Sequence, residues 1–413
     1  MSFLKANAAF DDFFLNKTLR VDYFHGGNKD NEYYFLDEYK EEPFWGGSKV
    51  NLIDHFNYGN YMFKVFDKSS NTLIYSLGYS TLFTEWQSTD EAKKLSKSFT
   101  ETIVLPYPKK TVRIEFYSRK NKAQTWNKKF ELEVDPTSYF ISHERKNQYN
   151  PFKVIDNGDP ETKLDIVFIP DGYTREQMSD FKKDCERFAG YILNSAPYNE
   201  VKNQINIWGV EAPSEESGTD IPGDQIWKKT VANSTFYTFD SERYLMIYDT
   251  KTLRDLAANT PYDQIVILVN SDKYGGGGIY NDYATIAAKN SNADFVAIHE
   301  FGHSFAGLGD EYYTSDVAVE DFYPSNIEPW EPNLTTLVSF DKKWKSMLAP
   351  GTAIPTLVTE ESKTKVGVFE GGGYVAKGVY RPMFDCTMKS IQYNNFCPVC
   401  KAAIKEMVKY YSK

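Results

Sequence analysis

Ala297-Ile-His-Glu-Phe-Gly-His-Ser-Phe-Ala-Gly-Leu-Gly-Asp-Glu-Tyr312 contains two histidines four residues apart, His299 and His303. In a helix this spacing places both imidazoles on one face, close enough to bind the same metal ion. Glu300 follows the first histidine and points toward the same pocket without having to be a ligand. This is the H-E-x-x-H pattern, in which two histidines bind zinc and the glutamate acts on a water molecule. The sequence therefore predicts a zinc hydrolase with Glu300 as its general base.

The third zinc ligand is expected from the residues that follow this helix. Catalytic zinc usually takes three protein ligands, and we predict a helix over 293–306 that is ended by the Gly-Leu-Gly after it. Because glycine can adopt positive φ, the chain can fold back there, and Asp310 is the expected third ligand. Glu311 and a more distant acid such as Glu320 remain alternatives. Whichever of Asp310 and Glu311 does not bind metal is expected to hydrogen-bond a ligating histidine.

An accidental H-E-x-x-H match, with histidines that are merely packed or exposed, is the alternative to a metal site. The apolar residues that flank the motif argue against it, because they would bury charge without compensation. These residues are Phe295, Val296, Ile298 and Phe305.

Composition bounds the class of protein. The chain has 413 residues, which favours two domains, and its formal charge of −10 argues against nucleic-acid and anionic-membrane partners. No segment approaches the ~20 apolar residues of a transmembrane helix. The first ten residues lack an apolar core, so no signal peptide is visible, as also expected after its removal.

Two halves with different patterns follow each other along the chain. Residues 1–140 contain short segments that alternate apolar and polar side chains, which predicts an all-β sandwich of about seven strands. Residues 141–163 are polar and contain prolines, as expected of a linker. Residues 164–413 alternate buried strands with helices, which predicts an α/β domain with a mostly parallel twisted sheet. The strands predicted in the first half are 19–24, 61–66, 99–104, 112–117 and 130–134.

The second half is predicted in more detail around the motif. Strands are expected at 164–170, 205–211, 264–269 and 279–288, and helices at 174–193 and 250–258. Four glycines at 275–278 precede the last strand and indicate a flexible loop, because no phosphate-binding sequence follows them. The strand at 279–288 is either an ordinary edge strand or one wall of a cleft that pairs with an extended peptide.

The motif resembles the zinc motif of the IgA-specific metallopeptidase family, whose members are secreted or surface proteins of gut bacteria. Leu164-Asp-Ile-Val-Phe-Ile-Pro-Asp-Gly-Tyr173 and Tyr274-Gly-Gly-Gly-Gly278 are similar to that family as well, and the β-rich first half resembles its N-terminal domain. The resemblance implies a metzincin-like catalytic fold with Zn²⁺ bound by His299, His303 and Asp310. Metzincins carry the glycine and third ligand one position earlier than this chain does.

A metzincin-like fold also implies a methionine turn beneath the metal. Asp385-Cys-Thr-Met-Lys-Ser390 is the candidate, with Met388 as an apolar floor rather than a ligand; a plain core methionine is the alternative. Cys397-Pro-Val-Cys400 opens the last helix. A redox motif or half of a zinc knuckle is possible there, but a structural role is favoured, with a disulfide from Cys386 fastening the helix to the turn.

These observations predict a secreted or envelope-attached zinc endopeptidase that acts on protein or peptide substrates. The resemblance implies host glycoproteins such as immunoglobulin A, although no residue pattern identifies an immunoglobulin hinge. One alternative is a catalytically weak glycan- or glycoprotein-binding surface protein that retains a zinc site. Another is an exopeptidase or amidase with the same metal chemistry.

Overall fold

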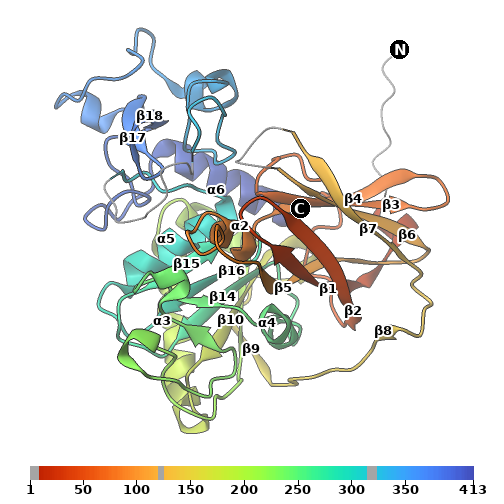
Figure 1. The fold of residues 1–413 in the computed structure, drawn as a ribbon. Coiled ribbons are helices and arrows are strands. Elements are labelled where there is room, and N and C mark those ends of the chain that lie inside the picture. The colour runs from red at the N-terminus through yellow and green to blue at the C-terminus, as the bar shows by residue number, and fades with distance from the viewer. Residues whose placement is uncertain (1–8, 120–124, 314–322) are drawn as a thin grey trace.

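The computed structural model describes residues 9–119, 125–313 and 323–413. The chain is a two-part α/β protein, in which N-terminal β-sheets are followed by a mixed, mostly parallel sheet with helices (Figure 1). None of the described helices combines the length and apolar character needed to span a bilayer.

The N-terminal part contains two four-stranded sheets, with strand orders β5-β1-β2-β8 and β4-β3-β6-β7. Side chains from both sheets, including Val21, Val65 and Phe116, share one buried core. All five strands predicted for this part are confirmed. The short elements are α1 (Phe10–Phe13) and α2 (Leu82–Gln87), and the strands are β1 (Phe14–Gly27), β2 (Glu32–Glu42), β3 (Tyr61–Asp67), β4 (Thr72–Tyr79), β5 (Lys97–Pro108), β6 (Val112–Ser118), β7 (Asn127–Val134) and β8 (Ile141–Ser142).

The second part is built on a six-stranded sheet of order β15-β16-β14-β10-β11-β9. Strands β16, β14, β10 and β11 are parallel, and β15 and β9 run antiparallel at the two edges. The strands predicted at 164–170, 205–211 and 264–269 are confirmed. The bounds are β9 (Pro151–Ile155), β10 (Leu164–Asp171), β11 (Ile205–Val210), β14 (Gln264–Val269), β15 (Gly276–Ile279) and β16 (Tyr283–Ala287).

The glycine run is where the predicted strands and the structure differ. Residues 275–278, predicted as a flexible loop, contribute to edge strand β15, and the strand predicted at 279–288 is β16, joined to β15 by a short turn. A Cβ on Gly278 would lie 2.3 Å from the carbonyl oxygen of Glu300. Glycine is therefore required because β15 packs directly against the helix of the motif, a contact that composition does not reveal.

The central strand β10 is buried on both faces, as its apolar run predicts. Ile166 and Phe168 face a core formed with α3, α5 and α6, whereas Val167 and Ile169 face a core with α4 and α2. Helix α2 of the N-terminal part thus belongs to the core of the second part. The bounds of the remaining elements are α3 (Met178–Asn194), β12 (Ser234–Thr235), β13 (Met246–Ile247), α4 (Thr250–Ala257), α5 (Ala293–Ala306), β17 (Phe369–Gly372), β18 (Val375–Arg381) and α6 (Pro398–Tyr411).

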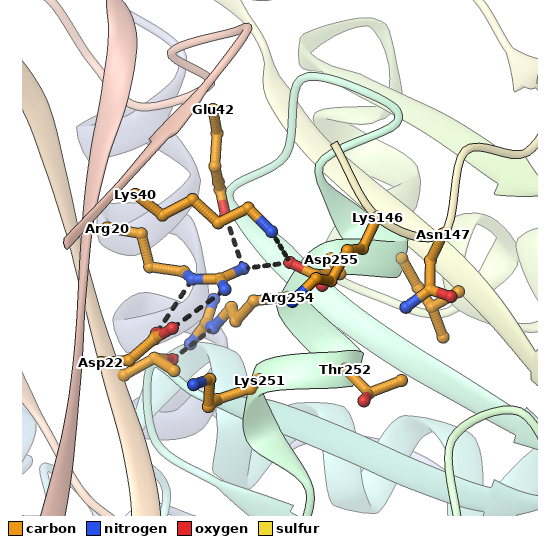
Figure 2. Close-up of polar contacts among 12 residues, drawn as sticks. Arg20, Asp22, Lys40, Glu42, Lys146, Asn147, Lys251, Thr252, Arg254 and Asp255 are labelled. Carbon is orange, nitrogen blue, oxygen red and sulfur yellow. Dashed lines mark hydrogen bonds and ion pairs between the residues drawn. The ribbon is translucent and has the colours of Figure 1, made fainter. Parts of the chain in front are cut away.

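A buried network of charges joins the two parts (Figure 2). Arg20 on β1 and Lys40 on β2 each lie 2.7 Å from Asp255 Oδ1 on α4. Asp22 and Glu42 also pair with Arg20, whose side chain is 1% exposed. Because each buried charge has an opposite partner, the network stabilises one relative placement of the two parts.

Two strands fall within residues 141–163, the segment predicted to be a linker. β8 pairs with β2 of the N-terminal part, and β9 pairs with β11 of the second part. These pairings tie each end of the segment to a different sheet.

The four cysteines are all free thiols. Cys386 Sγ and Cys400 Sγ lie 3.9 Å apart, whereas a disulfide requires about 2.0 Å. The structure therefore lacks the bridge predicted from Cys386 to the last helix, although the three residues at 386, 397 and 400 do lie together.

Candidate metal centre

Helix α5 carries the two histidines and ends where the sequence predicts. Gly307 adopts φ +61°, and its N–H bonds the carbonyl of His303 at 3.1 Å. The next N–H, that of Leu308, bonds the carbonyl of Gly302 at 3.2 Å. These bonds turn the chain back along the helix instead of letting it continue, which brings Asp310 to the histidine face.

Three side chains converge at this point: His299, His303 and Asp310. The two Nε2 atoms are 3.1 Å apart. Asp310 Oδ1 lies 3.1 Å from His299 Nε2 and 3.2 Å from His303 Nε2. The structure thus brings together the two predicted histidines and the first-choice acid.

Backbone carbonyls determine the tautomer of both histidines. His299 Nδ1 lies 3.0 Å from the carbonyl oxygen of Thr387, and His303 Nδ1 lies 2.6 Å from that of Leu308. A carbonyl only accepts, so each Nδ1 carries the proton. In the neutral imidazole each Nε2 then presents a lone pair to the centre, as a metal ligand must.

The geometry fits a tetrahedral ion. Bonds of about 2.0–2.1 Å from zinc to nitrogen and oxygen place ligand atoms about 3.3–3.4 Å apart, close to the 3.1–3.2 Å observed. Asp310 Oδ1 is buried and, within the described residues, accepts no well-directed hydrogen bond. Three electron-rich atoms crowded at this distance repel each other unless a cation lies between them, so the residues fit a metal ion.

The electrostatics of the cluster agree with this interpretation. Burial opposes ionisation of Asp310, but the neighbouring charges of His303 and His299 outweigh it and hold the pKa of Asp310 well below its usual range. Burial also lowers the pKa of His303, yet Asp310 outweighs it and raises that pKa to about 9. The site therefore attracts positive charge.

The loop that carries Asp310, residues 307–311, is called the ligand loop below. Two residues from distant parts of the chain hold this loop in place, and sequence reasoning missed both. Asn333 bonds the N–H and the carbonyl of Gly309, each at 2.8 Å. Tyr374, at the tip of the β17–β18 hairpin, donates its hydroxyl proton to Asp310 Oδ2. Its neighbour Gly373 donates its backbone N–H to the carbonyl of Asp310 at 2.8 Å. No spacing pattern in the sequence connects these residues to the motif.

Glu300 lies on the same helix and faces strand β15. A Cβ on Gly276 would lie 3.1 Å from Glu300 Cγ, so the strand covers this side chain closely. Burial raises the pKa of Glu300, although His299 and His303 partly oppose the shift. The outer edge of β15 is partly occupied, because Gly276 exchanges backbone hydrogen bonds with Arg243 and Leu245. The strand predicted at 279–288 is neither an edge strand nor free to pair with a peptide, because β16 lies between β15 and β14. A peptide could pair only with what remains of the outer edge of β15.

The remaining predicted residues lie as follows. Met388 is fully buried in a turn, and a Cβ on Gly302 of α5 would lie 3.0 Å from its sulfur, so it packs beneath the helix. Glu311 bonds Asn333 and Cys400 instead of a histidine, which differs from the expected role of the second acid. Glu320 lies outside the described residues.

Comparison with protein families gives two matches. Residues 152–365 and 357–408 match the IgA peptidase M64 family, and residues 9–131 match the peptidase M64 N-terminus. A search of curated proteins found no match. The first family covers the six-stranded sheet, the helix of the motif and the loop that follows it. The chain therefore belongs to the IgA peptidase M64 family, a family of metallopeptidases.

Proposed function

We propose that the chain is a zinc-dependent endopeptidase with a metzincin-like catalytic domain. The observation that carries this proposal is the convergence of His299 Nε2, His303 Nε2 and Asp310 Oδ1 within 3.1–3.2 Å of each other. Two nitrogens and one carboxylate oxygen are a donor set typical of catalytic zinc, which keeps one position open. The turn that contains Met388 supports the metzincin-like assignment.

The residues divide the chemistry among them. When bound, a zinc ion supplies a Lewis acid that makes a water molecule acidic enough to lose its proton near neutral pH. Glu300 accepts that proton and later donates it to the departing amine. Its raised pKa lies closer to neutral pH, where one carboxyl group can both accept and donate a proton. The carbonyls of Thr387 and Leu308 hold the imidazoles in the tautomer that binds metal.

The expected substrate is a protein, with immunoglobulin A or another host glycoprotein as the class that family membership favours. Because immunoglobulin A is a secreted protein, we also propose that this chain acts outside the cell, either free or attached to the envelope. The family matches at 9–131 and 152–408 support a division into an N-terminal domain (1–140), a connection (141–163) and a catalytic domain (164–413), with strand β9 of the connection joining the catalytic sheet.

The test combines metal analysis with cleavage of a diverse peptide library. Purified wild type is expected to hold zinc and to cut internal peptide bonds, whereas cutting only at chain ends would favour an exopeptidase. Glu300→Gln is expected to keep the histidine-bound zinc and to lose about 10²–10⁴-fold in rate. Equal cleavage by both proteins, or a wild type without zinc, would contradict the mechanism.

A binding role for the N-terminal part is the second candidate. Phe24 and Phe35 face each other across β1 and β2 with 38% and 58% of their surfaces exposed. Tyr139 and Phe140, also exposed, have ring centroids 4.3 Å apart. Exposed aromatic groups suit glycan or glycoprotein surfaces. Glycan-array binding that persists in Glu300→Gln but is lost in Phe24→Ser/Phe35→Ser would favour this role.

A further inference from the structure

A second cluster of metal-ligating side chains lies next to the first. It consists of Glu311, Cys386, Cys397 and Cys400, whose donor atoms all lie within 4.8 Å of one another. All four residues are at most 2% exposed. Three thiols and a carboxylate rarely share a buried space without a reason, because each is costly to bury in its charged form.

We propose that these four residues form a closed structural site for a zinc ion, separate from the histidine site. Three sulfurs and one oxygen complete a tetrahedral set without an open position, which distinguishes structural from catalytic zinc. Thiolate-rich sets select zinc over the hard cations magnesium and calcium. The site needs no ligand from outside the chain.

The distances fit this assignment. Zinc–sulfur bonds of about 2.3 Å place two tetrahedral sulfurs about 3.8 Å apart, and a sulfur and an oxygen about 3.6 Å apart. Cys386 Sγ and Cys400 Sγ are 3.9 Å apart, and Cys400 Sγ lies 3.4 Å from Glu311 Oε1. These two sulfurs are thus at ligand spacing and too far apart for a disulfide.

Backbone N–H groups point at two of the sulfurs. The N–H of Cys400 donates to Cys397 Sγ at 3.4 Å, and the N–H of Cys397 donates to Cys386 Sγ at 3.2 Å. Cys397 is also the N-cap of α6, where the positive end of the helix dipole favours a thiolate. The backbone therefore favours the anionic form of sulfur that binds metal.

Glu311 supplies the strongest argument for a cation. Its side chain is fully buried, and its Oε2 atom has no hydrogen-bond partner within the described residues. Arg381 and Lys389 are neighbouring cations. Arg381 Nη1, however, donates to the carbonyls of Glu370 and Gly371, and Lys389 Nζ donates to that of Phe384. A metal ion would supply the positive charge that compensates the buried carboxylate and sulfurs.

The site joins three segments, two of which also contribute to the histidine centre. Glu311 follows the ligand Asp310, Cys386 precedes Thr387, whose carbonyl bonds His299, and Cys397 and Cys400 open α6. The N–H of Glu311 also bonds the carbonyl of Met388 at 2.8 Å. Zinc bound by these residues would fix the positions of the ligand loop and the methionine turn relative to each other.

The experiment counts zinc in the full chain after dialysis against metal-free buffer. Wild type is expected to hold two zinc ions, and His299→Ala/His303→Ala is expected to retain one. Adding Cys400→Ser to that variant is expected to remove the last ion, while adding Cys185→Ser, a buried cysteine outside the cluster, leaves it in place. Cobalt loaded into the histidine variant is expected to give a thiolate-to-metal charge-transfer band that Cys400→Ser abolishes.

A further measurement applies if Cys400→Ser fails to fold. Titration of the folded histidine variant with a mercurial is expected to release one zinc ion into a chromogenic chelator. A histidine variant with no zinc and no thiolate band would overturn the proposal, and so would purified protein in which two of the three thiols form a disulfide. If instead the thiolate-bound zinc is found but wild type cuts no peptide, the proposed peptidase function fails and this site stands.

Discussion

Asp310 and Glu311 are adjacent in the chain, yet their carboxylates belong to different clusters. Asp310 Oδ1 faces the two histidines of α5, and Glu311 Oε1 lies 3.4 Å from Cys400 Sγ. One short stretch of chain therefore places a carboxylate at each cluster. This arrangement favours Asp310 over Glu311 as the third ligand of the proposed histidine site.

The hydroxyl of Tyr374 is expected to tune metal affinity through Asp310. Tyr374→Phe removes the proton donated to Asp310 Oδ2 and leaves the ring in place. Loss of a hydrogen bond that orients a ligand typically weakens metal binding about 10–100-fold. Competition with a chelator of known affinity measures this. Tyr380→Phe, on the same hairpin, is the matched control, and equal affinities of the two variants would refute the role of Tyr374.

Gly278 is expected to be essential for the contact between β15 and α5. In Gly278→Ala the new Cβ would lie 2.3 Å from the carbonyl oxygen of Glu300 and 3.1 Å from His303 Cβ. We expect a loss of about 1–3 kcal/mol in the free energy of unfolding and reduced peptidase activity, because the motif helix must move. Urea unfolding and a peptide assay measure the two effects.

A matched substitution separates this clash from the general effect of replacing glycine. Gly190 lies inside α3, and the nearest atom to a Cβ there is Asn194 Nδ2 at 3.8 Å. Gly190→Ala is expected to stabilise the protein by about 0.5–1 kcal/mol, because alanine loses less backbone entropy in a helix. Similar changes at both positions would show that β15 does not depend on glycine.

The glycine run also marks the limit of what the sequence can predict here. Local patterns identified α5, its end at Gly307 and the return of Asp310 to the two histidines, because helix spacing and glycine conformation act over a few residues. The same rules misassigned 275–278, since the contact that requires glycine comes from a helix some twenty residues later. Asn333, Tyr374 and the pairing of Glu311 with the cysteines depend on tertiary packing, and no spacing rule encodes it.

The charge network between the two parts predicts a large effect from one carboxylate. Asp255→Ala removes the partner at 2.7 Å from both Arg20 and Lys40, which are 1% and 7% exposed at their side chains. Breaking a buried pair typically costs about 3–5 kcal/mol, because the remaining charge stays buried; here that charge is Lys40, since Arg20 keeps Asp22 and Glu42. We expect a loss of this size in urea unfolding. Asp37→Ala is the control, since its pair with Lys251 is partly exposed and worth about 0–1 kcal/mol; equal losses would contradict the buried network.

His25 is expected to stabilise the N-terminal sheets in a pH-dependent way. Its ring is fully buried, with Nδ1 at 2.9 Å from Glu101 and Nε2 at 3.3 Å from Glu32. Both carboxylates only accept, so the imidazolium satisfies them best. Burial lowers the pKa of His25, but Glu101 and Glu32 outweigh it and raise that pKa above its ordinary value.

The sign of the effect follows from the raised pKa. The contribution of His25 is fully present below its unfolded pKa of about 6.5 and is lost as the pH rises through its higher folded pKa. Glu32 stays ionised while His25 titrates. Burial raises the pKa of Glu32, but hydrogen bonds from His25 and Ser118 outweigh burial and lower that pKa to about 2. The difference in unfolding free energy between wild type and His25→Gln is therefore expected to shrink as the pH rises above about 6.5. A difference that is constant or grows over this range, measured by urea unfolding of both proteins, would contradict a charged His25.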